Sequence, residues 1–219
     1  MKHDLRTRTF IVFAAITSVF VLARQLFGVE NIFEMFGMLI RDPLGFFPFV
    51  FHRFINFFYD IFIGMDYRGA LVLTFLGLNI AAAILLYKNT KKTKTIGWAF
   101  AIIPALAMMF TRFFQVVSQE DIISTISTLA AGGISWGIIG LAQALVPLLI
   151  IIIAITELAK VKNKTADLIL GAALIGVFCL AHLIEVIINF TPDFRYWLNE
   201  LIRINLFIFT LVVWSRFEK

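Results

Sequence analysis

Long apolar stretches that alternate with short clusters of charged residues constrain this chain more than any other feature. Each stretch is close to the about 20 residues that an α-helix needs to cross the hydrocarbon core of a bilayer. Of the 219 residues, 61% are hydrophobic and 15% are charged, against about 25% charged residues in soluble globular proteins. A soluble fold cannot enclose so much apolar surface. The chain is therefore predicted to be an all-α integral membrane protein.

Six transmembrane helices are predicted, arranged as three hairpins in a single polytopic domain over residues 1–219. The sixth is the shortest, because Arg203 and Asn205 interrupt it, but an arginine near a helix end can extend its charge to the interface. The first apolar run resembles a signal peptide, yet no A-x-A-like cleavage site follows it, so we expect this span to be retained. The predicted spans are 9–28, 69–87, 96–115, 134–156, 168–190 and 198–215.

The lysines test this topology independently of hydropathy, because Lys and Arg in short loops are retained on the cytoplasmic side. With six spans and the N-terminus inside, every lysine falls in an inner segment. We therefore expect a multi-pass protein of the cell inner (cytoplasmic) membrane with both termini cytoplasmic. The net charge of +5 belongs to these helix ends and not to a soluble basic face, so no nucleic-acid partner is expected. The lysines are Lys2, Lys88, Lys91, Lys92, Lys94, Lys160, Lys162, Lys164 and Lys219.

Residues 30–68, between the first and second spans, are rich in phenylalanine. In a helix from Pro43 to Gly64, three polar residues lie on one face and five phenylalanines on the other, which is typical of an amphipathic helix at the membrane interface. Asp42 is the predicted N-cap, and Asn31 to Leu39 is predicted to form a shorter interfacial helix. A re-entrant hairpin is the alternative. The polar residues are Arg53, Asn56 and Asp60; the phenylalanines are Phe47, Phe51, Phe54, Phe58 and Phe62.

Two further outer segments follow the same plan. Ser118 and Asp121 resemble a capping box, which predicts a helix from Ser118 to Leu129 before the fourth span. The sequence Thr-Pro-Asp at 191–193 predicts the start of a helix that contains Tyr196 and Trp197, aromatic residues suited to the headgroup level. Each predicted hairpin thus runs along the outer surface before it returns.

The strongest candidates for chemistry lie in the fifth span. His182, Glu185 and Asn189 occupy positions i, i+3 and i+7 and share one helical face. Ionisable groups at membrane depth are costly and usually face the bundle or a water-filled cavity. The functional interpretation is a proton-responsive or cation-binding pair, because a carboxylate beside an imidazole stabilises its charged form. The structural alternative is an ion pair with an arginine predicted at the same depth, such as Arg112 or Arg203.

Other polar residues in the spans are Asn79, Gln143 and Asn205, which commonly form hydrogen bonds between helices. A lone His-x-x-Glu pair does not predict a metal site, because such sites need three or four ligands. The single cysteine, Cys179, lies inside a span and is interpreted as a small buried hydrophobe. No protease, Walker A or dinucleotide-binding signature is present, so neither an enzyme nor a cofactor is expected.

Two functions fit these features. The first is a transport or channel component, a permease-like subunit with an outward-facing polar cavity, because polar residues fall mainly in the outer halves of the spans. The second is a non-catalytic structural or scaffolding subunit of a larger membrane complex, because the aromatic helix at 43–64 offers a large contact area. Both predict the lipid bilayer as a partner, together with other membrane subunits or further copies of the chain. An intramembrane enzyme that uses His182 and Glu185 is a weaker third hypothesis, since no nucleophile shares their face.

Overall fold

The fold is known from a computed structural model, which describes residues 3–27, 32–64, 67–117, 134–161, 163–188 and 194–218. Every secondary-structure element among these residues is an α-helix, as the all-α prediction requires. The helices are α1 (Leu5–Phe27), α2 (Ile32–Arg41), α3 (Pro43–Phe62), α4 (Tyr67–Lys88), α5 (Lys91–Val117), α7 (Ile134–Leu158), α8 (Lys164–Ile188) and α9 (Phe194–Phe217).

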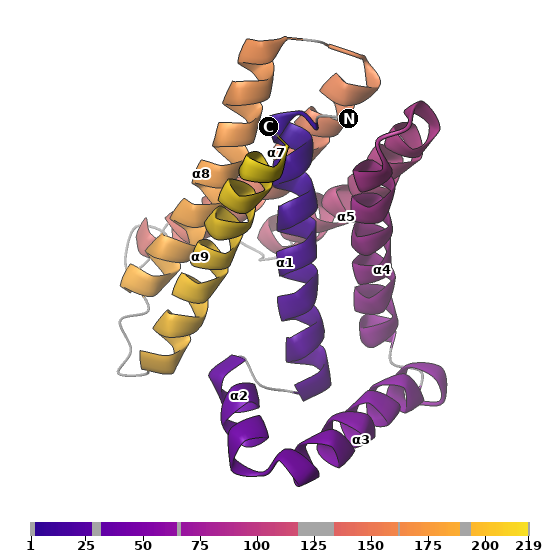
Figure 1. The fold of residues 1–219 in the computed structure, drawn as a ribbon, viewed down its shortest axis with the longest axis vertical. Helices are drawn as coiled ribbons and strands as arrows, with labels where there is room; N and C mark the ends of the chain where they lie inside the picture. Colours follow the sequence, from indigo (N-terminus) through magenta and orange to yellow (C-terminus); the bar gives the residue numbers. More distant parts are fainter. Residues whose placement is uncertain are drawn as a thin grey trace.

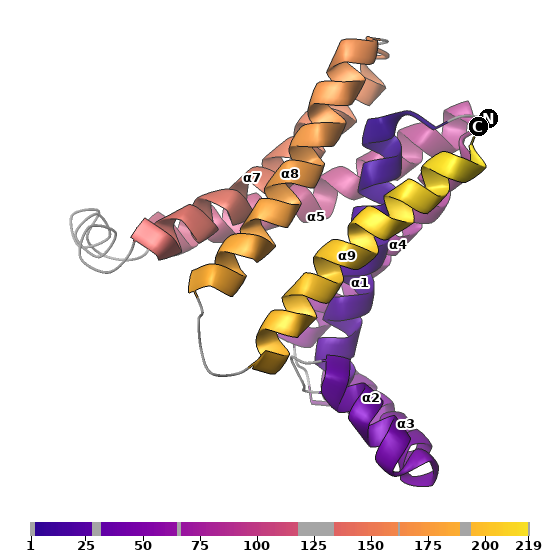
Figure 2. The same cartoon turned by 60° about the vertical axis from the view of Figure 1, so that its left-hand side comes forward.

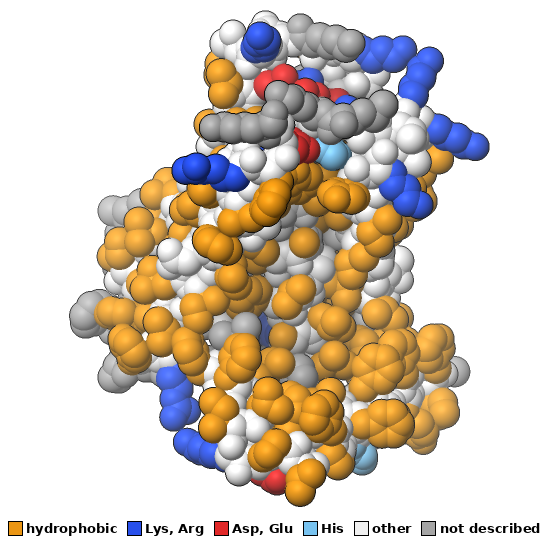
Figure 3. All heavy atoms as spheres, viewed as in Figure 1, with side chains coloured by type: hydrophobic (Ala, Val, Ile, Leu, Met, Phe, Trp, Pro, Cys, Tyr) orange, Lys and Arg blue, Asp and Glu red, His pale blue; other side chains and the backbone are white. Residues whose placement is uncertain are grey.

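Five of these helices, α1, α4, α5, α8 and α9, are long and apolar enough to cross a membrane. The chain is thus a helical protein with the features of a multi-pass membrane protein. On the face drawn in Figure 3, apolar side chains cover most of the middle, whereas Lys and Arg gather toward the two ends. This distribution suits a bilayer, in which the hydrocarbon core excludes charge and the headgroup regions accept it.

The helix α1 lies at the centre of the bundle. In its most apolar stretch of 18 residues, 50% is buried inside the structure. In the corresponding stretches of the other four candidate spans, 17–28% is buried. Its aromatic side chains pack on both sides: Phe10 lies 5.1 Å from Trp98 of α5 between ring centroids, and Phe13 lies 5.5 Å from Phe178 of α8. Phe207 of α9 completes this core, 4.7 Å from Phe178. The described centre of the bundle is therefore packed with apolar side chains.

Two glycines allow neighbouring helices to approach closely. A Cβ atom at Gly171 of α8 would lie 2.8 Å from Leu5 Cγ and 3.3 Å from the backbone nitrogen of Arg6, so α8 rests directly against the start of α1. A Cβ atom at Gly97 of α5 would lie 2.9 Å from Leu86 Cγ of α4. Small residues thus set the helix separation at one end of the bundle.

The helices α2 and α3 stand apart from this bundle. They lie at the end opposite to the two chain termini and project away from it (Figures 1 and 2). The expected N-cap is confirmed, because the Gly45 backbone N–H donates to Asp42 Oδ1 at 2.8 Å and Pro43 begins α3. Arg195 Nη1 of α9 lies 3.6 Å from Glu34 Oε1 of α2 and links this pair to the bundle.

Near the C-terminus, the structure differs from the prediction in one respect. A short outer helix around Tyr196 and Trp197 was expected to precede a separate span at 198–215, whereas α9 is one continuous helix that begins at Phe194. The outer segment and the span therefore share one axis. The predicted helix from Ser118 to Leu129 lies outside the described residues.

Candidate functional site

A buried carboxylate is the centre of a polar cluster at the ends of α8 and α9 that are remote from the chain termini, which we call the outer ends. Glu200 of α9 contacts the Nδ1 atom of His182 of α8 through one carboxylate oxygen. Its other oxygen lies 3.1 Å from Arg203 Nη1, one helical turn further along α9. The Glu200 side chain is only 3% exposed. Two groups that carry or can carry positive charge therefore compensate one carboxylate that water hardly reaches. We call His182, Glu200 and Arg203 the outer cluster.

Apolar rings surround the outer cluster and hold its members in place. The ring of Phe178, one turn below His182 on α8, packs edge-on against the imidazole at 4.5 Å between centroids. The guanidinium of Arg203 lies 4.5 Å from the ring centroid of Phe20 of α1, a cation–π geometry. Glu200, Arg203 and the fully buried Phe207 follow the i, i+3, i+7 spacing of one helix face. The cluster thus forms the outer end of the face that α9 turns toward the core.

The outer cluster combines one carboxylate with two side chains that carry nitrogen donors. An ionised carboxylate accepts hydrogen bonds only, while imidazole and guanidinium supply N–H donors. Histidine is also the side chain whose charge changes most readily near neutral pH. Protonation of either Glu200 or His182 therefore alters the balance of charge at this point between α8 and α9.

A second cluster lies at the other end of the bundle and is built around Arg6, whose side chain is 3% exposed. Its Nε atom lies 2.5 Å from Glu157 Oε1 of α7 and 2.6 Å from Asp167 Oδ1 of α8. Its two terminal nitrogens donate to Thr156 Oγ1 at 3.1 Å and to the Val161 carbonyl oxygen at 2.9 Å. We call Arg6, Glu157 and Asp167 the inner cluster. It fastens the first turn of α1 to the α7–α8 hairpin.

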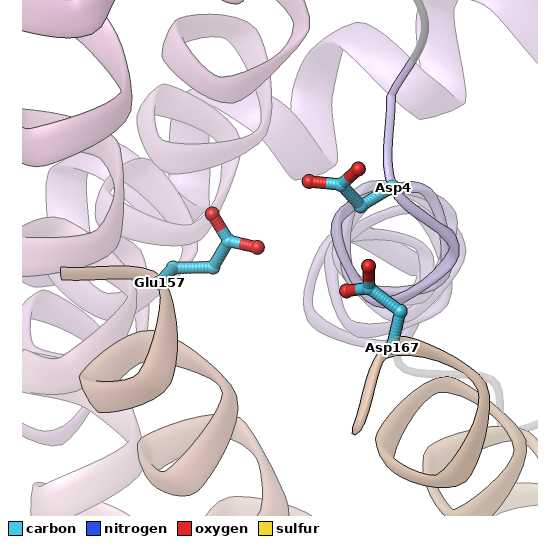
Figure 4. Close-up of side chains that lie close together, drawn as sticks. All are labelled: Asp4, Glu157 and Asp167. Carbon is cyan, nitrogen blue, oxygen red and sulfur yellow. The ribbon is translucent and has the colours of Figure 1, made fainter. Parts of the chain in front are cut away.

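A third carboxylate joins this end. Asp4, Glu157 and Asp167 come from three different segments, and their carboxylates turn toward a common space (Figure 4). One oxygen of each lies within 4.8 Å of the others. Arg6 supplies the nearest positive charge, and Lys94 of α5 also acts on Glu157 and Asp167 electrostatically. The inner cluster is thus a network of ion pairs centred on a guanidinium.

The residues predicted for the polar pathway fall into three groups. His182 belongs to the outer cluster. Asn79 is half-buried on α4, while Asn205 is exposed on α9, where its side-chain nitrogen donates to the Leu201 carbonyl oxygen of the same helix at 2.7 Å. The expectation that Asn205 lies inside the bundle is therefore not met. Arg112, Gln143 and Glu185 lie on helices α5, α7 and α8, but the structure does not describe their side chains, and Asn189 lies outside the described residues.

The predicted interfacial residues all lie on α3, in which no described residue is buried. Two polar side chains bond within this helix: Asn56 Nδ2 lies 3.1 Å from His52 Nε2, and the Arg53 guanidinium lies 5.4 Å from the Phe49 ring centroid. On the opposite face, stacked or tilted contacts join Phe54, Phe58 and Phe62 to one another. Because residues 43–62 form one helix, the predicted polar and aromatic residues lie on different faces of it. The polar residues are Arg53, Asn56 and Asp60, and the aromatic residues are Phe51, Phe54 and Phe58.

Of the six residues in these two clusters, only His182 was predicted as a site residue. The five that were not predicted are Glu200, Arg203, Arg6, Glu157 and Asp167. A signal existed for Glu200, because a Glu-x-x-Arg pair followed by Phe207 at i+7 places charge and core on one face. Arg6 gives a weaker signal. It stands among the basic residues that precede the first span, where arginine ordinarily faces headgroups and water.

Comparison of the chain with protein-family models finds no match. Nor does the chain match any curated protein or any solved structure with which it was compared. The two clusters and α3 are therefore the features of the molecule that bear on its function.

Proposed function

We propose that this chain is a six-span protein of the inner (cytoplasmic) membrane, with both termini cytoplasmic, that serves as a permease-like transport component. The sixth span of this proposal is α7. Its side chains from Leu145 to Leu158 are apolar except for those of Thr156 and Glu157. An even number of crossings is supported by the two termini, which lie at the same end of the bundle (Figures 1 and 2). The lysine distribution supports the cytoplasmic assignment of that end.

The observation that carries the transport proposal is the buried carboxylate of Glu200, which His182 and Arg203 share at the outer ends of α8 and α9. Ionisable groups kept out of water at such a depth commonly mark ion pathways or proton relays. The apolar core beneath the outer cluster, with Phe178 and Phe207, closes the path in this conformation. Transport then requires α8 and α9 to separate, and a change of charge on Glu200 or His182 is the trigger that this geometry supplies.

The composition of the native assembly tests this proposal first. Native mass spectrometry of the complex, extracted gently from its own membrane, is expected to give the chain alone, as a homo-oligomer, or bound to an ATPase. The isolated form is then reconstituted in liposomes and assayed for proton and cation flux. Glu200→Gln is expected to lower the flux at least about tenfold, because it removes the charge that both partners need.

Asn205→Ala is the matched control for this assay, since Asn205 lies on the same helix but is exposed and bonds only to its own backbone. Flux equal to that of empty liposomes, with or without the native partners, contradicts the transport proposal. Flux that Glu200→Gln leaves unchanged contradicts the role of the outer cluster.

A structural subunit is the second candidate, and α3 is the observation that favours it. This helix buries none of its residues against the rest of the chain, and its aromatic face is available to lipid or to a neighbouring subunit. Under this hypothesis the native complex contains several different proteins, and deletion of residues 43–64 abolishes assembly. Assembly that survives this deletion excludes the structural hypothesis.

A further inference from the structure

His3, just before α1, occupies a site in which both nitrogens of its ring face hydrogen-bond acceptors. Its Nδ1 atom lies 2.6 Å from Glu218 Oε1 at the end of α9, and its Nε2 atom lies 3.0 Å from the carbonyl oxygen of Tyr87 in the last turn of α4. The His3 backbone N–H also faces the Glu218 carboxylate, at 3.3 and 3.4 Å. His3 is 9% exposed, so water competes little for these contacts.

The chemistry of the two acceptors determines which form of the imidazole fits. A carbonyl oxygen and an ionised carboxylate accept hydrogen bonds and donate none. A neutral imidazole has one N–H and can donate to only one of them, whereas the imidazolium has two and donates to both. The carbonyl of Tyr87 also belongs to a helix C-terminus, where positive charge is stabilised by the helix dipole. The geometry is therefore complete only when His3 is protonated.

Two aromatic rings and one carboxylate surround the His3 ring. Its ring stacks on Tyr87 at 5.8 Å and meets Trp214 edge-on at 5.4 Å, between ring centroids. Among the described residues, the charged or titratable groups established at this site are Glu218 of α9, Tyr87 of α4 and Arg8 of α1, the last 3.6 Å from Glu218. Among the carboxylates that the structure describes, Glu218 is the one in contact with the imidazole, through the Nδ1 atom.

His3 and Arg6 are close in the sequence and bind different helices of the bundle. His3 binds α4 and α9, and Arg6, three residues later, binds α7 and α8. A segment of only four residues thus holds the ends of four helices, α4, α7, α8 and α9. Release of His3 frees one end of this segment while Arg6 keeps the other in place.

We propose that His3 is a proton-operated latch at the end of the bundle that carries both termini. As the imidazolium, it joins α4 and α9 to the start of α1. When the pH rises and His3 loses its proton, one of the two hydrogen bonds is lost, and the ends of α4 and α9 loosen. This mechanism regulates the conformation of the bundle whichever of the two proposed functions the protein has.

Hydrogen exchange of the full chain in lipid nanodiscs tests this proposal, with each rate divided by the intrinsic rate at the same pH. Backbone amides of residues 3–8, 85–90 and 212–218 are expected to be about tenfold better protected at about pH 6 than at about pH 8.5. His3→Gln is expected to lack this difference and to show low protection at both values. His52→Gln is the matched control, because His52 is exposed on α3 and its ring contacts Asn56 of the same helix.

Protection that does not change with pH in the parent chain, or a change that persists in His3→Gln, overturns the latch. If His3→Gln does not fold, Glu218→Gln provides the second test, since it retains the imidazole and removes its charged acceptor. Low protection of the same three segments at both pH values is then expected. Protection equal to that of the parent chain in Glu218→Gln also overturns the proposal.

Discussion

The inner and outer clusters are both built from buried ion pairs, but the paired residues differ in how far apart they are in the sequence. Arg6 of the inner cluster pairs with residues about 150 positions away in sequence, and it joins α1 to α7 and α8. The outer cluster pairs Glu200 with residues 18 and three positions away, on the adjacent helices α8 and α9. The inner cluster therefore determines how the first helix docks, whereas the outer cluster acts within one helix pair.

The clusters also differ in which charge is buried. In the inner cluster, the central arginine is 3% exposed, and its partners Glu157 and Asp167 are 9% and 18% exposed, so loss of the arginine leaves at least one carboxylate, that of Glu157, that water reaches poorly. In the outer cluster, the central Glu200 is 3% exposed, but His182 and Arg203 are 16% and 24% exposed and can turn toward water. The inner end is thus suited to hold a fixed structure, and the outer end to change.

The largest effect is expected from Arg6→Leu. Removal of one partner from a buried ion pair typically costs about 3–5 kcal/mol, because the remaining charge is left uncompensated. Here Glu157 and Asp167 lose their shared partner, so the free energy of unfolding is expected to fall by about that amount. Reversible unfolding in mixed micelles, followed by tryptophan fluorescence, measures it.

The control for this substitution is Arg53→Leu, on the exposed polar face of α3, which is expected to change the free energy of unfolding little. Equal losses in the two variants contradict the view that the inner cluster holds α1 in place.

A smaller effect is expected from Glu200→Leu in the outer cluster. Hydrogen bonds to charged groups contribute about 1.5–3 kcal/mol, and His182 and Arg203 can recover part of the loss by hydration. The free energy of unfolding is therefore expected to fall by no more than this. Asn205→Leu, on the same helix but exposed, serves as the control. A loss as large as that in Arg6→Leu refutes the distinction between a fixed end and a changeable end.

The docking of α1 against α8 gives a third prediction, which does not involve charge. Gly171→Val places a branched side chain where even a Cβ atom lies 2.8 Å from Leu5 and 3.3 Å from the backbone of Arg6. Overpacking of this kind typically costs about 1–3 kcal/mol, and we expect a loss within that range. Gly176→Val, five residues further along α8, is the control, because a Cβ atom there has nothing within 4 Å. Similar losses in the two variants contradict a close contact between α8 and α1.

The helices were predictable from the sequence because hydrophobic runs and caps are local signals. The six predicted spans each coincide with a helix to within a few residues, and Asp42 acts as the expected N-cap. The polar and aromatic faces of α3 were also predictable, since the i, i+3, i+7 spacing alone determines them.

The ion-pair partners were not predictable in the same way. Hydropathy gives the depth of a residue in the membrane but not the direction in which its side chain points around the helix axis. The sequence therefore places His182 toward the C-terminal end of α8, while its contact with Glu200 depends on how α8 and α9 are rotated against each other. The pairs of Arg6 require α1, α7 and α8 to meet, which no local pattern in one helix specifies.

The smallest effect is expected at acidic pH and comes from Glu218, which lies beyond the apolar part of α9. Burial raises the pKa of this carboxyl group, but hydrogen bonds from His3 and Trp214 and the charge of His3 outweigh it and bring the pKa below the ordinary value of 4.5. The unfolded chain therefore takes up a proton at Glu218 at a higher pH than the folded chain does. It follows that the stabilisation by Glu218 is present above about pH 4.5 and is lost as the pH falls through the folded-state pKa.

The expected loss is on the order of 1 kcal/mol or less, because the carboxylate is partly exposed. Between about pH 6 and pH 3, the free energy of unfolding is expected to depend less on pH in Glu218→Gln than in the parent chain. Glu34→Gln, whose parent carboxylate is exposed on α2, is expected to retain the parent's dependence. A slope that Glu218→Gln leaves unchanged means that Glu218 does not hold the inner end in its ionised form, and the acid sensitivity must then be sought among the carboxylates around Arg6.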